Sequence, residues 1–185
     1  MPETPALTAV LFGLRGCLVQ AAEDSPSPIP GALQALNGLR RQHVPCIWLD
    51  ERDASHDQRL VLPDWLTGHS SSTSPWPAPD ACWQALMSLG IERLEGCVLV
   101  SGEPRLLRSG LNAGLWTVGL AACTPQCGLP LSEWQAMTRQ EQDRVRGRST
   151  LALFELGVHS VIDHFEALET CLDDIAQRRR KGEKP

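Results

Sequence analysis

The residues able to act as nucleophiles, bases or metal ligands are scattered along this 185-residue chain. The sequence contains no Gly-x-Ser-x-Gly or His-Glu-x-x-His motif. Lysine occurs only at Lys181 and Lys184, so chemistry that needs a lysine inside the fold is excluded. Cys123 and Cys127 form the one close cysteine pair, but the second pair of ligands that a zinc site requires is missing, and no metal is expected.

Two residues near the start of the chain offer more specific chemistry. Cys17 follows an apolar run at an expected strand-to-helix turn, where a thiolate can be stabilised, yet a cysteine there is more often a buried packing residue. Arg15 could hold an anion beside backbone N–H groups, or it could pair with Asp50 or Glu103. We expect the ion pair, because either carboxylate would compete with an anion for the guanidinium.

Apolar runs that alternate with helical patterns must position these residues. The runs predict buried strands at residues 7–12, 46–49, 97–100, 116–120 and 160–162. The apolar spacing between them predicts helices near residues 30–39, 79–90, 106–114 and 165–180. Two further helical stretches are expected to start at Ser132 and at Thr138, the second with a capping box formed by Thr138 and Glu141 and running toward Leu156. This alternation is typical of a Rossmann-like α/β/α fold with a central parallel sheet, and the length fits a single domain over residues 1–185. The serine-rich segment 69–75 predicts a flexible surface loop.

The charge pattern narrows the partners and the location. The net charge is −5, although the tail at residues 178–185 holds five of the 17 basic residues. The rest of the chain is therefore strongly acidic, which argues against binding of nucleic acid or an anionic membrane. We expect the tail to be a solvated, frayed helix end. Neither a membrane span nor a signal peptide is evident, so a cytoplasmic location with reduced thiols is expected.

Four segments resemble, in order, the motifs of haloacid dehalogenase-like (HAD) hydrolases. Residues 10–19 are similar to the apolar strand and Asp-x-Asp-Gly-Thr-Leu-Val of the first motif, and residues 76–80 to the Lys-Pro-x-Pro-Asp of the third. Residues 98–103 look like the strand and Gly-Asp-Ser of the fourth. Residues 110–120 closely resemble Gly-x-Asn-Ala-Gly-Met-Trp-Thr-Val-Gly of the phosphonoacetaldehyde hydrolases, and residues 131–163 resemble their last helices and Val-Ile-Asp strand.

The resemblance also implies that the nucleophile and the magnesium ligands are replaced. The nucleophilic aspartate aligns with Gly13, and the following acid/base position aligns with Arg15. The fourth-motif aspartate that completes the magnesium site aligns with Gly102, which leaves Glu103 one residue too late. No cofactor is therefore expected.

The phosphate-binding positions of the resemblance are altered too. The Ser or Thr of the second motif aligns with Leu49 or Asp50, and a carboxylate at Asp50 would repel phosphate. The third-motif lysine aligns with Trp76. In phosphonoacetaldehyde hydrolases a helical cap after the first motif supplies a Schiff-base lysine, whereas residues 20–29 here form only a short proline-rich loop. The cap domain and its lysine are expected to be absent together.

These departures predict a catalytically inactive, phosphonatase-like protein that serves as a protein-interaction or regulatory module. The alternative is a hydrolase of small phosphorylated or phosphonate compounds with a non-standard site. An unknown protein partner is expected, with either a monomer or a dimer formed without the cap. By alignment, four tryptophans fall near one crevice, where they would either plug it or form a contact surface centred on Trp65 and Trp76: Trp48, Trp65, Trp76 and Trp83.

Overall fold

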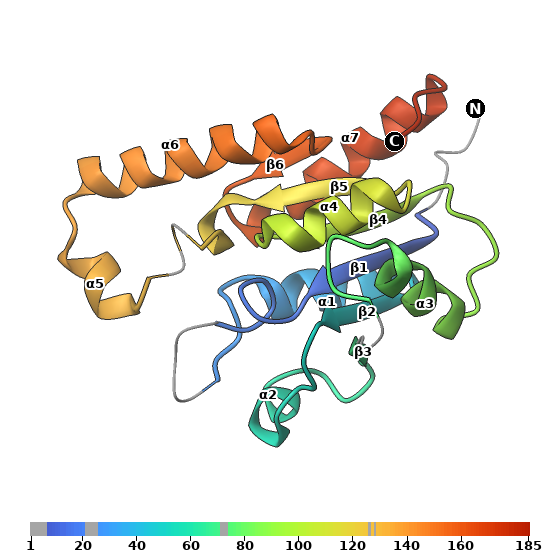
Figure 1. Ribbon diagram of the computed structural model, residues 1–185, viewed down its shortest axis with the longest axis horizontal. Coiled ribbons are helices and arrows are strands. Elements are labelled where there is room, and N and C mark those ends of the chain that lie inside the picture. The colour runs from blue at the N-terminus through green and yellow to red at the C-terminus, as the bar shows by residue number, and fades with distance from the viewer. Residues whose placement is uncertain (1–6, 21–25, 71–73, 126, 128) are drawn as a thin grey trace.

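The structure is a computed structural model that describes residues 7–20, 26–70, 74–125, 127 and 129–185. Its centre is a six-stranded parallel sheet with the strand order β3-β2-β1-β4-β5-β6 (Figure 1). The strands are β1 (Ala9–Gly13), β2 (Cys46–Asp50), β3 (Thr67–Ser70), β4 (Cys97–Ser101), β5 (Trp116–Leu120) and β6 (Ser160–Ile162). The predicted fold class is confirmed, and all five predicted strands are present.

The edge strand β3 was not predicted. Its sequence Thr-Gly-His-Ser has no apolar run, and the prediction of a loop from residue 69 is wrong for His69 and Ser70. A Cβ at Gly68 would lie 1.8 Å from the indole ring of Trp48, so the glycine lets β3 pass directly over that ring. Ser71–Thr73 lie outside the described residues.

Helices cover both faces of the sheet. They are α1 (Ala32–Arg41), α2 (His56–Leu60), α3 (Asp80–Ser88), α4 (Pro104–Asn112), α5 (Leu131–Ala136), α6 (Arg139–Leu156) and α7 (Leu168–Arg180), with 3₁₀ turns η1 (Ala121–Cys123) and η2 (Phe165–Ala167). In Figure 1, α3 and α4 lie in front of the sheet and α1 behind it. None of the helices in the described ranges is long and apolar enough to span a membrane.

Alternate residues of β1 join two separate cores. Val10 and Phe12 pack with buried side chains of α1 and α7, whereas Ala9 and Leu11 pack with those of α3 and α4. A sheet buried on both faces explains why its strands read as continuous apolar runs.

The arm formed by α5 and the first half of α6 projects beyond the carboxyl edge of the sheet (Figure 1). The start of α6 is fixed by a capping box in which the Thr138 hydroxyl accepts a hydrogen bond from the Glu141 N–H, and the Glu141 carboxylate accepts one from the Thr138 N–H. This confirms the helix start expected at Thr138. The remainder of α6 packs on the sheet through Leu153 and Ser149.

The C-terminal elements are joined by a cluster around Trp116. The guanidinium of Arg178 lies 4.8 Å from the ring centroid of Trp116 and donates to the His159 carbonyl. Arg178 also pairs with Glu183 at 2.8 Å. The expectation of a frayed, solvated tail is therefore wrong for Arg178, while residues 180–185 are exposed to solvent.

We expect the stability of the protein to fall as the pH drops below about 6.5, partly through His159. Burial, and secondarily the charge of Arg178, lowers the pKa of His159, whose Nδ1 accepts a hydrogen bond from the Thr117 N–H at 3.0 Å. Because the unfolded chain takes up this proton at a higher pH than the folded chain, stability is lost between those two pKa values. Urea unfolding at several pH values should show a weaker pH dependence for His159→Gln, while exposed His56→Gln keeps the wild-type profile.

Candidate functional site

The ends of three neighbouring strands meet at the carboxyl edge of the sheet, where open α/β folds bind their ligands. Gly13 pairs in register with Leu49, the residue before Asp50. A Cβ at Gly13 would lie 2.8 Å from Oγ of Ser101, so the ends of β1 and β4 also touch. The structure thus brings together three positions to which the sequence assigned a site, namely Gly13, Asp50 and Gly102, the last of which follows Ser101.

Arg15 and Asp50 form an ion pair at this edge. The Nη1 atom of Arg15 lies 2.6 Å from Oδ2 of Asp50, whose side chain is almost completely buried. The Nη2 atom of Arg15 donates to the Asp53 carbonyl at 3.0 Å and to Oε1 of Gln58 at 3.1 Å. The predicted ion pair of Arg15 is confirmed, with Asp50 as its partner.

Glu103 does not take part in that pair. Its carboxylate accepts a hydrogen bond from the Arg105 N–H at 3.0 Å and caps the N-terminus of α4. Its own N–H donates to Oγ of Ser101 at 3.0 Å. The side chain therefore stabilises the helix start, where a carboxylate also interacts favourably with the helix dipole.

A second ion pair, which the sequence did not predict, lies beside the first. Arg105 binds Glu51 through two contacts of 2.9 and 3.0 Å and donates to the Trp76 carbonyl at 2.7 Å. Glu51 in turn accepts from the Trp76 N–H at 2.8 Å. Arg105 and Glu51 are 54 positions apart, and only their places at the start of α4 and the end of β2 bring them together.

The four tryptophans do not share one crevice, and that expectation is wrong. Trp76 is 9% exposed and packs with the core on the α3–α4 face. Trp48 and Trp65 pack against the core on the opposite face, where Trp65 is half-buried under the guanidinium of Arg40. Trp83 is 42% exposed on α3. The burial of Trp76 favours the interpretation that it fills the crevice over the interpretation that it forms a contact surface.

Cys17 lies inside the core and not in an electropositive, accessible setting. Its Sγ atom is 3.4 Å from the Val100 carbonyl. Burial raises the pKa of the Cys17 thiol well above its ordinary value, and neighbouring Cys123 adds to that effect. Because the thiolate is the nucleophilic form, Cys17 is suited to packing and not to catalysis.

Close contact with η1 restricts what residue 102 can be. A Cβ at Gly102 would lie 2.3 Å from both the carbonyl carbon and the oxygen of Cys123. These are backbone atoms, so a side chain there requires the turn η1 to move. At Gly13 the closest atom is the rotatable hydroxyl of Ser101, which leaves more room for adjustment.

Comparison with known proteins shows which proteins this chain resembles. No family model matches the chain. It is 34% identical over 171 residues to a "Phosphonoacetaldehyde hydrolase" from Klebsiella pneumoniae, covering 88% of this chain and 64% of that relative. A "phoshonoacetaldehyde hydrolase like protein" from Oleispira antarctica superposes with a TM-score of 0.75 at 26% identity over 86% of this chain and 60% of that one. One further solved structure is 53% identical with a TM-score of 0.90, covering 97% of this chain and all of that one.

The chain belongs to the HAD superfamily. Its homologues are of the phosphonoacetaldehyde hydrolase type, and it spans less than two thirds of the length of the named relatives. The segment from Gln20 to Ile29 leads directly into α1, so no cap domain is inserted at this point of the HAD core. Residues 21–25 of that segment lie outside the described residues.

The residues at the edge of this HAD core do not fit magnesium, the cation that the resemblance implies. Across the described part of the chain, no three His, Cys, Asp or Glu side chains are grouped so that they could hold a metal. Asp50 and Glu51 lie at the end of β2, and each is already bound to an arginine. A hard cation would have to displace both guanidinium groups.

Arg15→Met should destabilise the protein by about 3 kcal/mol, because it leaves the buried Asp50 carboxylate unpaired. Arg105→Met should cost about 1 kcal/mol or less, since its pair with Glu51 is considerably more exposed. Urea unfolding gives both values. Asp50→Asn added to Arg15→Met should recover part of the loss, and equal losses for the two arginine variants would contradict this account.

Gly102→Ala should also destabilise the protein, by roughly 1–3 kcal/mol, because the new methyl group overlaps the Cys123 backbone. The matched variant is Gly147→Ala in the exposed part of α6, where a Cβ would meet no atom of the described residues within 4 Å. That substitution should stabilise the helix by about 1 kcal/mol or less. Differential scanning calorimetry should show melting temperatures that move in opposite directions.

Proposed function

We propose that this HAD-superfamily protein has lost hydrolase activity and acts as a protein-interaction or regulatory module. The observation that carries the proposal is the closure of the carboxyl edge by the chain's own ion pairs. Arg15–Asp50 and Arg105–Glu51 satisfy one another's charges at the place where a phosphoryl group would have to bind.

The glycines at the edge support the loss of covalent catalysis. In the resemblance, Gly13 takes the place of the nucleophilic aspartate and Gly102 that of a magnesium ligand. A carboxylate at Gly102 would in addition collide with the backbone of Cys123. The packing around η1 therefore leaves no room for a side chain at residue 102. Restoring a carboxylate there would require the η1 backbone to move as well as residue 102 to be substituted.

The electrostatics of the edge also oppose binding of a phosphoryl group. The two arginines are neutralised by Asp50 and Glu51, and the sequence offers no internal lysine to replace the one aligned with Trp76. An incoming dianion would lie next to two carboxylates and would have to compete with them for the guanidinium groups.

A second candidate is a hydrolase of small phosphorylated or phosphonate compounds with a non-standard site. It is favoured by the 34% identity to a protein named "Phosphonoacetaldehyde hydrolase". Such an enzyme would have to open the Arg15–Asp50 pair when substrate binds.

For a module that contacts a protein partner, the structure restricts the aromatic anchor. Trp76 is too buried to serve, which leaves half-buried Trp65 as the member of that pair that a partner can reach. Six of the seven free cysteines are buried and the seventh is partly so, which is compatible with the expected cytoplasmic location.

The purified protein should release no phosphate from phosphonoacetaldehyde or an aryl phosphate, with or without magnesium. Gly13→Asp should not revive activity, because the second carboxylate and the lysine are still missing. Magnesium-stimulated turnover that is lost in Arg15→Ala and retained in exposed Glu92→Ala would overturn the proposal and establish the second candidate. Folding of each variant is checked by circular dichroism.

A further inference from the structure

A groove lies between α1 and α7, and none of its lining residues belongs to the Arg15–Asp50 or Arg105–Glu51 pairs. Its volume is about 1020 Å³. Its floor consists of apolar side chains from both helices and from η2, among them Leu39, Phe165, Leu168 and Leu172. The floor belongs to the core on the α1–α7 face of the sheet.

The rim of this groove is acidic on the α7 side. Glu166, Glu169 and Asp173 are exposed, line the groove and follow one another at helical spacing. The only cationic side chain among the lining residues is Arg41, at the end of α1. A binding partner that complements this groove must therefore offer apolar side chains together with positive charge.

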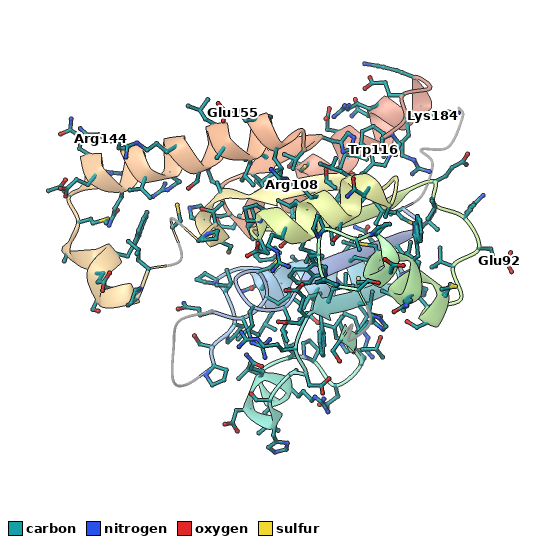
Figure 2. The ribbon with its side chains drawn as sticks, in the orientation of Figure 1. Glu92, Arg108, Trp116, Arg144, Glu155 and Lys184 are labelled. Atoms are coloured by element: carbon teal, nitrogen blue, oxygen red, sulfur yellow. The ribbon has the colours of Figure 1, made fainter. Side chains whose placement is uncertain are left out.

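The outer face of α6 offers that combination. Leu151 and Phe154 are 64% and 54% exposed on it. Arg144 and Arg148 continue the same face toward the start of the helix, at positions i−7 and i−3 from Leu151. Figure 2 shows Arg144 and Glu155, which lies on this face too, pointing away from the body of the molecule.

Glycines on both surfaces allow close approach of two helices. Gly38 lines the groove in the middle of α1, and Gly147 lies on the outer face of α6. At either position an added Cβ would meet no atom of the described residues within 4 Å, so packing within one copy does not require glycine. Glycine inside a helix is destabilising relative to alanine. A neighbouring helix packed against these positions would explain both glycines, because a residue without a side chain lets two helices approach closely.

We propose that the protein self-associates by inserting the outer face of α6 from one copy into the α1–α7 groove of another. Leu151 and Phe154 pack on the apolar floor, and the arginines face the acidic rim. The charges also set a direction, since Arg144 and Arg148 are drawn toward Glu166 and Glu169. Glu155 then lies toward Arg41 at the other end, so α6 runs roughly parallel to α7. The inference holds whether or not the protein is a hydrolase.

Sedimentation velocity of the full chain over a range of concentrations tests this docking. The wild-type protein should self-associate. Glu169→Lys/Asp173→Lys in the groove should weaken association at least about tenfold, and so should Arg144→Glu/Arg148→Glu on α6, because each places like charges together. The control Glu92→Lys/Glu95→Lys reverses two exposed acidic residues between α3 and β4, where Figure 2 shows Glu92, and it should associate like the wild type.

Mixing the two charge-reversed proteins gives the decisive measurement. The groove variant carries a basic rim and the α6 variant an acidic helix, so the mixture should associate more tightly than either variant does alone. Phe154→Asp, an exposed position, should abolish association without changing the groove. A wild-type chain that stays monomeric at about 1 mM would overturn the proposal, and binding of a basic peptide from another protein to the groove would then be tested. A mixture that fails to associate would overturn it as well.

Discussion

The carboxylate of Asp50 is only 7% exposed at the end of β2, and burying it requires a cation in contact. Arg15 meets that requirement, and its position follows from the turn after β1, in which the Cys17 N–H donates to the Leu14 carbonyl while the Leu14 N–H stays bound to the Leu49 carbonyl of β2. The remaining donors of Arg15 reach the Asp53 carbonyl and Gln58, so the same guanidinium also anchors the segment that leads into α2. The buried charge of Asp50 thus holds Arg15 in place, and Arg15 in turn binds Asp53 and Gln58 at the carboxyl edge.

In this protein side chains occupy the strand ends, and the groove lies between helices on another side of the sheet. In an open α/β sheet the crevice at the strand ends is the usual place for a ligand. Here that edge is filled by Trp76 and by arginine–carboxylate contacts, while the back of the sheet keeps a groove between α1 and α7. The fold alone does not determine the function of such a chain, which depends on the side chains at these sites.

Most of the sheet could be predicted because each central strand is a short apolar run bounded by polar residues or glycine. β3 could not, since its place depends on Gly68 lying over the Trp48 ring, a contact between residues 20 positions apart. At the site, alignment with known motifs located Arg15 and Asp50 correctly. The Arg105–Glu51 pair was missed because neither residue belongs to a motif, and the tryptophans were misplaced because linear order does not specify which face of a sheet a side chain packs on.

The rate at which the buried thiols are modified can report how often parts of the fold open. Burial raises the pKa of Cys46, Cys82 and Cys123 to about 12, so these side chains are almost entirely un-ionised and inaccessible near neutral pH. Reagents that modify thiolates can therefore reach them only during transient exposure, and their rates of modification measure the frequency of opening in separate layers of the protein. Cys82 reports on the α3 layer and Cys46 on the opposite core, so alkylation resolved by residue distinguishes local opening of one face from unfolding of the whole sheet.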